Sequence, residues 1–197
     1  MTEHILILFA EIAMQTYISI LRGINVSGHK MIKMEALRKM YEELKFKNVK
    51  TYIQSGNVVF QDKKGKSADL EKKIAKKILE ATGFEVPVMV KELDELVAVL
   101  KNNPFLNKRK EDPLKLHVTF LSGQPGKAEV EKIGMGNYGK DEYIIAGNAV
   151  YLFCPDGYGN TKLSNTFFEN KLKLTATTRN WKTVNELVNM GSNAENA

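Results

Sequence analysis

Two stretches of this chain that lie far apart in sequence are built alike. Residues 52–60 and residues 143–151 align without a gap, and five of the nine positions match: tyrosine, isoleucine, glycine, asparagine and the second valine. In each stretch two β-rich runs flank a Gly-Asn pair, which is typical of a β-hairpin. A common hairpin turn predicts the glycine and the asparagine but not the flanking matches. We therefore interpret the chain as an internal duplication, which restricts it to folds made of two similar halves.

The segments around the first hairpin predict a β-α-β-β-α-β order. The expected elements are a strand at 17–21, a helix at 34–46, hairpin strands at 49–53 and 57–61, a helix with Ser67 as its N-cap and apolar positions at 70, 74 and 78, and a strand at 86–90. This is the order of a ferredoxin-like unit. Its last strand lies at a sheet edge, which suits Pro87 because proline has no N–H to donate to a neighbouring strand.

The same order returns after a helical stripe at 93–100. The expected elements are a strand at 116–121, a helix at 127–134, hairpin strands at 142–146 and 149–154, a helix that includes 163–168, a strand at 174–178 and a closing helix that includes 181–188. The predicted fold class is α+β, with tandem ferredoxin-like βαββαβ halves, antiparallel sheets, and linking and C-terminal helices. We expect the first half at 14–91, a helix and linker at 92–114, the second half at 115–190 and a frayed polar tail at 191–197.

The composition fits a globular protein in a reducing compartment. The chain has 197 residues, 43% of them hydrophobic, which argues against disorder. Its single cysteine excludes a disulfide framework within one chain. Cys154 ends an apolar run, so we expect a buried small hydrophobe rather than a nucleophile. The histidines, His4, His29 and His117, are too scattered to predict a metal site. We predict no metal, no cofactor and a cytoplasmic location.

The first 13 residues are an N-terminal extension of doubtful status. The apolar run at 5–10 is too short to span a membrane, which takes about 20 residues, and it lacks the positive flank of a signal peptide. It is either an extra segment packed on the protein or sequence upstream of a start at Met14. We expect no membrane partner, and the oligomeric state stays open.

The loop after the first strand has the composition of an anion site. It runs from Arg22 to Lys30 and includes Gly23 and Asn25. Glycines let the backbone approach a ligand, helix N-terminal amides are free donors, and the two cations favour a phosphate or a carboxylate. The loop is neither a dinucleotide-binding fingerprint nor a Walker A loop. The alternative is an ordinary connection with turn glycines and solvated cations.

Topology predicts which residues lie beside this loop. In a β-α-β-β-α-β unit the end of the first strand and the tip of the hairpin share one end of the sheet. Ser55, Gly56 and Asn57 should therefore lie near the loop from Arg22 to Lys30, where the arginine, lysine, hydroxyl and amide groups would form an oxyanion pocket. The alternative is that Asn57 only satisfies its own turn.

Two further segments repeat this chemistry in the second half. The loop at 155–164 contains Gly157, Gly159 and Lys162, and its expected helix cap is Asn160, Thr161 or Ser164. It can join the first loop only if the two halves are inverted relative to each other. The segment at 177–183 opens the last helix, with Thr178 as the expected cap and Trp181 in the core. Arg179 is its functional candidate.

These strings together resemble a bacterial family of unknown function, DUF1697. The resemblance rests on Leu-Arg-Gly-Ile-Asn-Val at 21–26 with Lys30, on Ser-Gly-Asn at 55–57, on Pro-Asp-Gly-Tyr-Gly at 155–159 with Lys162, and on Thr-Thr-Arg-Asn-Trp at 177–181 with Thr183. It covers residues 14 to 190, and Ser27 stands where the family often has a second glycine. The resemblance implies a pair of ferredoxin-like halves and an unassigned function. It also implies a start near Met14.

Charge and motifs together favour binding of a small anion. Residues 14–91 hold 16 Lys and Arg against 8 Asp and Glu, so the positive charge of the chain, +6 in total, belongs to the first half. The leading hypothesis is a phosphate-bearing ligand held through Arg22, Lys30, Asn57, Lys162 and Arg179. One alternative is nucleic-acid binding, although the strand at 57–61 lacks the aromatic pattern of an RRM. Another is an enzyme that uses the same loops, for which no base or nucleophile can be named.

Overall fold

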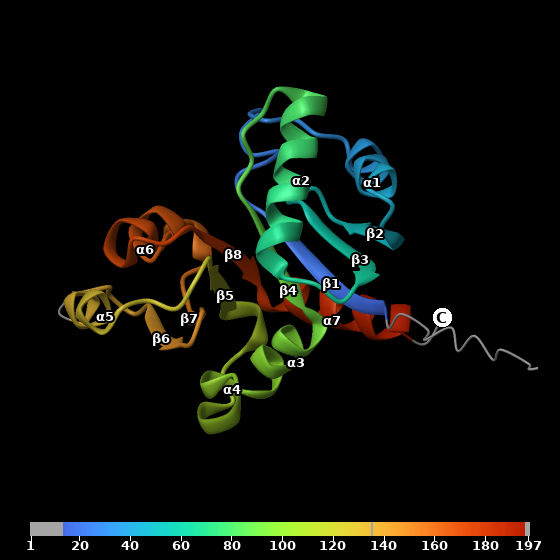
Figure 1. Cartoon of the computed structure of the whole chain (residues 1–197). Coiled ribbons are helices and arrows are strands. Elements are labelled where there is room, and N and C mark those ends of the chain that lie inside the picture. The colour runs from blue at the N-terminus through green and yellow to red at the C-terminus, as the bar shows by residue number, and fades with distance from the viewer. Residues whose placement is uncertain (1–13, 135, 196–197) are drawn as a thin grey trace, which may run out of the picture.

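The structure is a computed structural model that describes residues 14–134 and 136–195 (Figure 1). The extension at 1–13 lies outside the described residues. The first half contains β1 (Met14–Leu21), α1 (Met34–Glu43), β2 (Lys47–Tyr52), β3 (Asn57–Lys63), α2 (Ser67–Thr82) and β4 (Val88–Glu92). The strands form an antiparallel sheet in the order β2-β3-β1-β4. The last strand lies at an edge, with Pro87 immediately before it, as the ferredoxin-like order requires.

Two helices connect this sheet to the second one. They are α3 (Leu93–Lys101) and α4 (Pro104–Arg109), followed by the short 3-10 turn η1 (Pro113–Lys115). The helix expected in 92–114 is α3, and the rest of that stretch, expected to be a linker, contains the further helix α4. Asn103 caps α4 by accepting a hydrogen bond from the amide of Phe105, and the Phe105 side chain is buried. A proline at the first helical position ends the preceding segment and starts α4.

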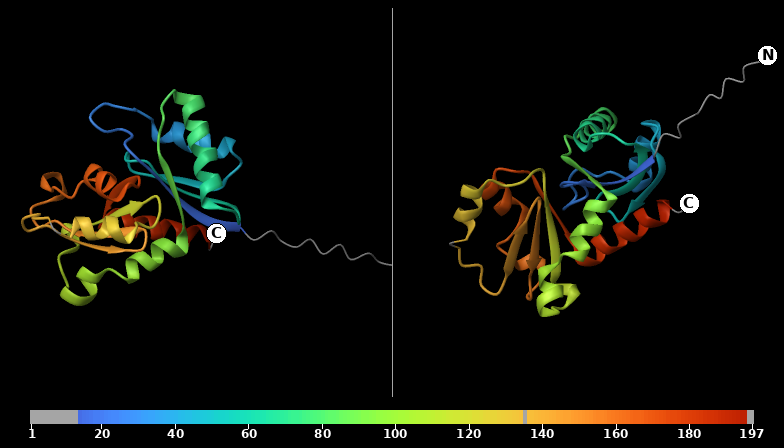
Figure 2. Two further views of the ribbon diagram at one scale, coloured as in Figure 1. Left: turned by 60° about the vertical axis from the view of Figure 1, so that its left-hand side comes forward. Right: turned by 60° about the horizontal axis from the view of Figure 1, so that its bottom comes forward.

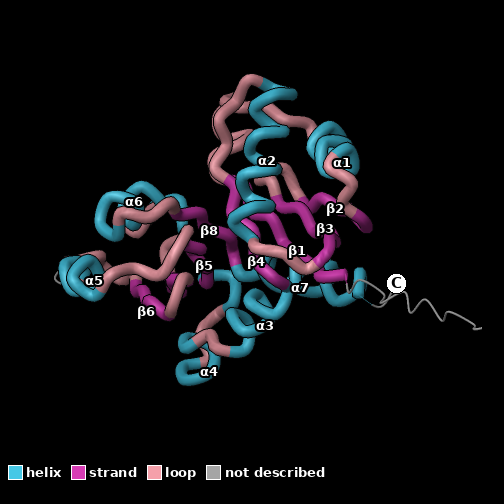
Figure 3. The backbone as a smooth tube through the Cα atoms, in the orientation of Figure 1, coloured by secondary structure: helices cyan, strands magenta, loops and turns pink. Residues whose placement is uncertain are grey.

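The second half repeats the first in order and in strand arrangement. It contains β5 (Leu116–Leu121), α5 (Lys127–Ile133), β6 (Glu142–Ala146), β7 (Ala149–Phe153), η2 (Tyr158–Asn160), α6 (Asn165–Leu172), β8 (Ala176–Asn180) and α7 (Trp181–Glu195). Its antiparallel sheet has the order β6-β7-β5-β8, position for position that of the first sheet (Figure 3). The predicted α+β class with two antiparallel sheets is confirmed.

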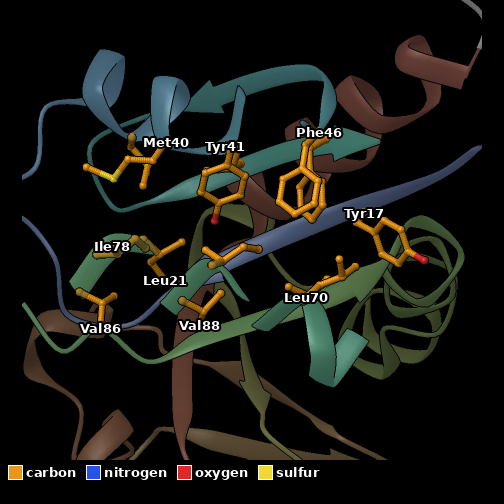
Figure 4. Packing of buried hydrophobic residues seen from close by; sticks show 14 of the residues in the cluster. Tyr17, Leu21, Met40, Tyr41, Phe46, Leu70, Ile78, Val86 and Val88 are labelled. Carbon is orange, nitrogen blue, oxygen red and sulfur yellow. The ribbon is translucent and has the colours of Figure 1, made fainter. Parts of the chain in front are cut away.

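Three hydrophobic clusters hold these layers together. The first lies between one face of the first sheet and helices α1 and α2, and it includes Tyr17, Tyr41 and Phe46 (Figure 4). The third lies between the second sheet and helices α5 and α6. The middle cluster combines the remaining faces of both sheets with α3 and α7, and Figure 2 shows α7 running alongside the first sheet. Strand β1 is buried on both faces, which explains its continuous apolar run.

Several predicted boundaries need correction. The first helix ends at Glu43 rather than 46, because Lys45 has a φ of +68°, which a continuing α-helix cannot accommodate. Ser67 is the first residue of α2 and not its cap. Thr178 lies in β8; the cap of α7 is Asn180, whose Oδ1 accepts from the amide of Thr183 at 2.8 Å. The predicted tail is wrong for 191–195, which continue α7 and bury Ala194.

Candidate functional site

Arg179 of the second sheet penetrates the first half of the molecule. It lies opposite Val118 on the face of the second sheet that carries the middle cluster. Its Nε donates to Asn57 Oδ1 at 2.6 Å, and its Nη2 donates to the carbonyl oxygens of Leu21 and Ser55, both at 2.8 Å. Nη1 donates to Thr177 Oγ1 and to the carbonyl of Thr178. All five N–H groups of the guanidinium are therefore used.

This arginine is a buried cation with uncharged partners. Only 8% of the residue is exposed, and its acceptors in the described structure are carbonyl, amide and hydroxyl oxygens, without a carboxylate. Burial lowers the pKa of Arg179 to about 10, so the side chain is still charged at neutral pH. The result is a fixed positive charge at the junction of the two sheets.

The first glycine-containing loop is held against the hairpin tip, as the topology predicts. The amide of Leu21 donates to the carbonyl of Gly56 at 2.8 Å. Asn25 Nδ2 donates to the carbonyls of Ile32 and Gln54, and its Oδ1 accepts from the amide of Ile32. Asn57 Nδ2 donates to the carbonyl of Tyr52 and to Ser55 Oγ. Both asparagines therefore shape the backbone at this end of the sheet.

Arg22 contacts the second half rather than Asn57. Its Nε and Nη2 donate to the two carboxylate oxygens of Glu169 on α6, at 3.0 and 2.8 Å. The hydrogen bond to Glu169 raises the pKa of Arg22. Burial would raise the pKa of Glu169, but Arg22 and the amide of Ala176 together lower it. The first loop and α6 thus form a half-buried ion pair across the junction.

A pocket of about 300 Å³ opens where the two halves meet, and we call it the junction pocket. Its lining comes from the first hairpin, the second glycine-rich loop, β5, β8 and the start of α7. The lining residues are Ile53, Ser55, His117, Tyr158, Thr178, Arg179, Asn180 and Thr183. None of these residues is acidic. The second glycine-rich loop reaches this pocket through Tyr158 and the hairpin tip reaches it through Ser55, whereas no residue of the first loop, 22–30, lines it.

The first turn of α7 forms one wall of the junction pocket. Asn180 and Thr183 line the pocket, and Asn180 caps the helix. In the first turn of a helix the amides have no intrahelical carbonyl partner, which applies here to Trp181 and Lys182, and the positive end of the helix dipole therefore lies at this wall. Arg179 comes immediately before the cap, which places the buried cation beside the helix terminus.

His117 and Tyr158 form an aromatic wall. Their rings are stacked, with centroids 4.9 Å apart and an interplanar angle of 26°. His117 Nδ1 is buried and makes no hydrogen bond within the described residues. Burial lowers the pKa of His117, and the backbone of Lys115 offsets this only in part. Burial also raises the pKa of Tyr158, whose hydroxyl donates to Thr178 Oγ1 at 2.9 Å.

Ile53 at the rim of the pocket has an unusual backbone. Its φ is +48°, a region that β-branched residues rarely adopt, and the residue is 48% exposed. Strained backbone of this kind is concentrated at functional sites. The equivalent residue of the second hairpin, Ile144, lies within the regular strand β6 and is 41% exposed.

The remaining predicted residues are not gathered in this pocket. Lys30 lines a separate groove of about 520 Å³ beside α2, and its Nζ donates to the carbonyl of Glu85. Lys162 and Gly157 line a third pocket of about 200 Å³, which also contains Asp141 and Asp156. The structure places Gly23 in the turn after β1 and Gly159 within η2. Of the predicted set, Ser55 and Arg179 reach the junction pocket directly.

Sequence reasoning missed His117, Thr178, Thr183 and Ile53 as pocket residues. His117 reaches the pocket because it lies opposite Asn180 in the β5–β8 ladder, and pairing between distant strands leaves no local signal. Tyr158 was within the predicted loop but was not singled out. Ser164 is confirmed as the cap of α6, since its Oγ accepts from the amide of Phe167.

Three further observations concern metal binding, the thiol of Cys154 and membrane-spanning helices among the described residues. It contains no cluster of three or more His, Cys, Asp or Glu side chains that could hold a metal ion. The Cys154 thiol is fully buried, and burial raises its pKa to about 11. No helix among the described residues is long and apolar enough to cross a lipid bilayer.

Fold and site together define an α+β protein of two antiparallel four-stranded sheets, joined by a buried arginine and opening into a pocket without acidic lining. The family model described as protein of unknown function (DUF1697) matches residues 14–151, and the chain belongs to this family. No curated protein matches it. Among solved structures, the chain is similar to the conserved bacterial protein SP0830 from Streptococcus pneumoniae, with a TM-score of 0.72 and 24% identity. The alignment covers 90% of this chain and 99% of that protein, and it shows the same fold.

Proposed function

We propose that this protein binds a small anionic, phosphate-bearing ligand in the junction pocket. The observation that carries the proposal is that the buried Arg179 guanidinium and the first turn of α7 share a pocket with no acidic lining residue. A helix N-terminus supplies free amides and a positive potential, and both favour an oxyanion. An uncompensated cation in a poorly solvated site adds to this potential far more than one in water.

Some groups of the pocket would contact the ligand directly, and Arg179 would act through its electrostatic field. Ser55 accepts a hydrogen bond from Asn57, so its own proton is free to donate to the ligand. The amides at the start of α7 are further donors. Arg179 has no N–H left and acts through its charge alone. Gly56, Asn25 and Asn57 hold the hairpin tip in place, and Gly157 and Gly159 belong to the loop that carries Tyr158.

The exposed cations have a secondary role in this proposal. Arg22 is paired with Glu169, while Lys30 and Lys162 lie in other pockets. Together with lysines and arginines elsewhere in the chain, these three residues would raise the local concentration of anions by long-range attraction, which salt screens. A phosphorylated metabolite of the reducing cytoplasm fits a chain whose one cysteine is a buried free thiol.

Isothermal titration calorimetry with inorganic phosphate and pyrophosphate tests the proposal. The decisive variant is Ile53→Glu, which adds a negative charge at the pocket rim. Its matched control is Ile144→Glu, at the equivalent and similarly exposed position of the other hairpin. We expect Ile53→Glu to weaken pyrophosphate binding about 10-fold at low salt and the control to bind like the wild type.

Two results would contradict the proposal. One is the absence of heat with either anion at low salt. The other is an equal effect of the two substitutions, because a uniform change in net charge would then explain the binding. A steep loss of single-stranded RNA binding with salt, in the absence of pyrophosphate binding, would favour the nucleic-acid alternative instead.

A further inference from the structure

The junction pocket is larger than an inorganic anion requires. A phosphate ion has five non-hydrogen atoms and occupies only part of the pocket volume of about 300 Å³. A ligand that only places an oxyanion at the start of α7 would leave the rest of the pocket wet. The remaining lining therefore carries information about the rest of the ligand.

That remaining lining is flat and largely apolar. The stacked rings of His117 and Tyr158 form one side, and the half-exposed side chain of Ile53 lies at the rim. Aromatic and aliphatic side chains of this kind pack against planar rings, and a base stacked on an aromatic side chain contributes substantially to affinity. Thr178 Oγ1 is already engaged by Tyr158, Thr119 and Asn165, so it adds no free donor to this side.

The two parts of the pocket are adjacent. His117 and Asn180 are paired directly across the β5–β8 ladder, so the aromatic wall and the start of α7 are neighbours in the sheet. A ligand that uses both must carry its ring and its anionic group a short distance apart, within one small molecule.

We propose that the ligand of the junction pocket is a mononucleotide, with its phosphate at the first turn of α7 and its base against the His117–Tyr158 wall. This inference rests on the proposed anion-binding function and names the class of anion. Ser55 and the α7 amides hold the phosphate, and the rings and Ile53 hold the base.

Calorimetry with three probes separates the two parts of the site. The probes are adenosine monophosphate, ribose 5-phosphate and adenosine. We expect adenosine monophosphate to bind at least about 10-fold more tightly than either of the others. Equal binding of ribose 5-phosphate would overturn the mononucleotide inference and leave the anion site standing. Equal binding of adenosine would overturn the anion site. No binding by any probe would overturn both.

Two variants locate the base. Tyr158→Leu removes the stacked ring and should reduce the affinity for adenosine monophosphate to that for ribose 5-phosphate. Tyr158→Phe keeps the ring and is the matched control, expected to retain the preference. A full preference in Tyr158→Leu would overturn the placement of the base. Because that variant could also disturb the fold, nuclear Overhauser effects from the base protons to the Tyr158 ring in the wild type give an independent measurement. Their absence under saturating ligand would overturn the inference.

Discussion

Arg179 and Asn57 lie 122 residues apart in sequence, and Arg179 Nε donates to Asn57 Oδ1 at 2.6 Å. Arg179 Nη2 also donates to the carbonyl oxygens of Leu21 and Ser55. All three acceptors belong to the first half, and their donor belongs to the second. The hairpin tip of the first sheet is thus completed by a residue of the second sheet. The junction pocket exists only in the assembled chain, because its walls come from both sides of this contact.

Replacing the buried Arg179 should lower the free energy of unfolding, whereas replacing an exposed arginine should change it little. In Arg179→Met the acceptors on Leu21, Ser55 and Asn57 lose buried hydrogen bonds, and we expect a loss of about 3 kcal/mol in the free energy of unfolding. Urea unfolding followed by circular dichroism measures this loss. Arg109→Met is the control, since Arg109 pairs with Glu142 on the exposed surface and should leave the midpoint nearly unchanged. A similar midpoint for both variants would show that the buried contact is dispensable.

The two hairpin glycines should respond differently to the same substitution. Gly56 and Gly147 both have positive φ, at +76° and +60°. An added Cβ at Gly56 would lie 2.9 Å from Leu21 Cβ and 2.7 Å from Ile24 Cδ1, whereas at Gly147 it meets nothing within 4 Å. We expect Gly147→Ala to cost about 1 kcal/mol from backbone strain alone, and Gly56→Ala to cost about 3 kcal/mol because overpacking adds to it.

Chemical denaturation of the two alanine variants tests this difference. Gly56→Ala should also lose pyrophosphate binding, because the hairpin tip that carries Ser55 must move, while Gly147→Ala should bind like the wild type. Equal destabilisation would mean that the first loop relaxes without cost around Gly56.

Much of the fold was predictable because its signals are local. The Gly-Asn turns, the alternation of β-rich runs and helical stripes, and Pro87 before the edge strand all follow from a few neighbouring residues. The errors lie at the ends of helices and at the C-terminal segment, where tertiary contacts override local preference. Residues 191–195 look like a polar tail, yet Gly191 packs against Leu93, and the carbonyl of Ala194 accepts a hydrogen bond from Gln61 Nε2.

The site was less predictable because it depends on how two similar sheets face each other. The same-end argument correctly placed the Arg22 loop beside Ser55 and Gly56. It did not reveal that the guanidinium bound to Asn57 would come from Arg179, or that Arg22 would pair with Glu169. His117 carries no local signal, since its neighbours in space come from β8 and from the loop after β7.

The single cysteine offers a direct measure of how closed the second half is. Burial raises the pKa of Cys154 to about 11, so at pH 8 its thiolate fraction is roughly 100-fold below that of a free thiol. We expect Ellman's reagent to react with the native protein only at the rate of local opening, and rapidly in denaturant. Because the chain has one cysteine, no second thiol complicates the measurement. Stoichiometric reaction within seconds under native conditions would contradict the observed burial.

His117 should make stability depend on pH in mildly acidic solution. Burial lowers its folded-state pKa below the usual value of 6.5, so the unfolded chain binds a proton more readily than the folded one. This contribution is fully favourable above pH 6.5 and is lost as the pH falls from 6.5 through the folded-state pKa.

The groups around the His117 ring do not reverse this pH dependence. Tyr158 stacks on the ring as a neutral phenol, and Arg179, a cation that lines the same pocket, disfavours a second positive charge. The urea midpoint of the wild type should decrease when the pH is lowered from 7 to 5. The urea midpoint of His117→Phe should decrease less over the same range. An identical pH dependence in the variant would show that His117 is not the titrating group.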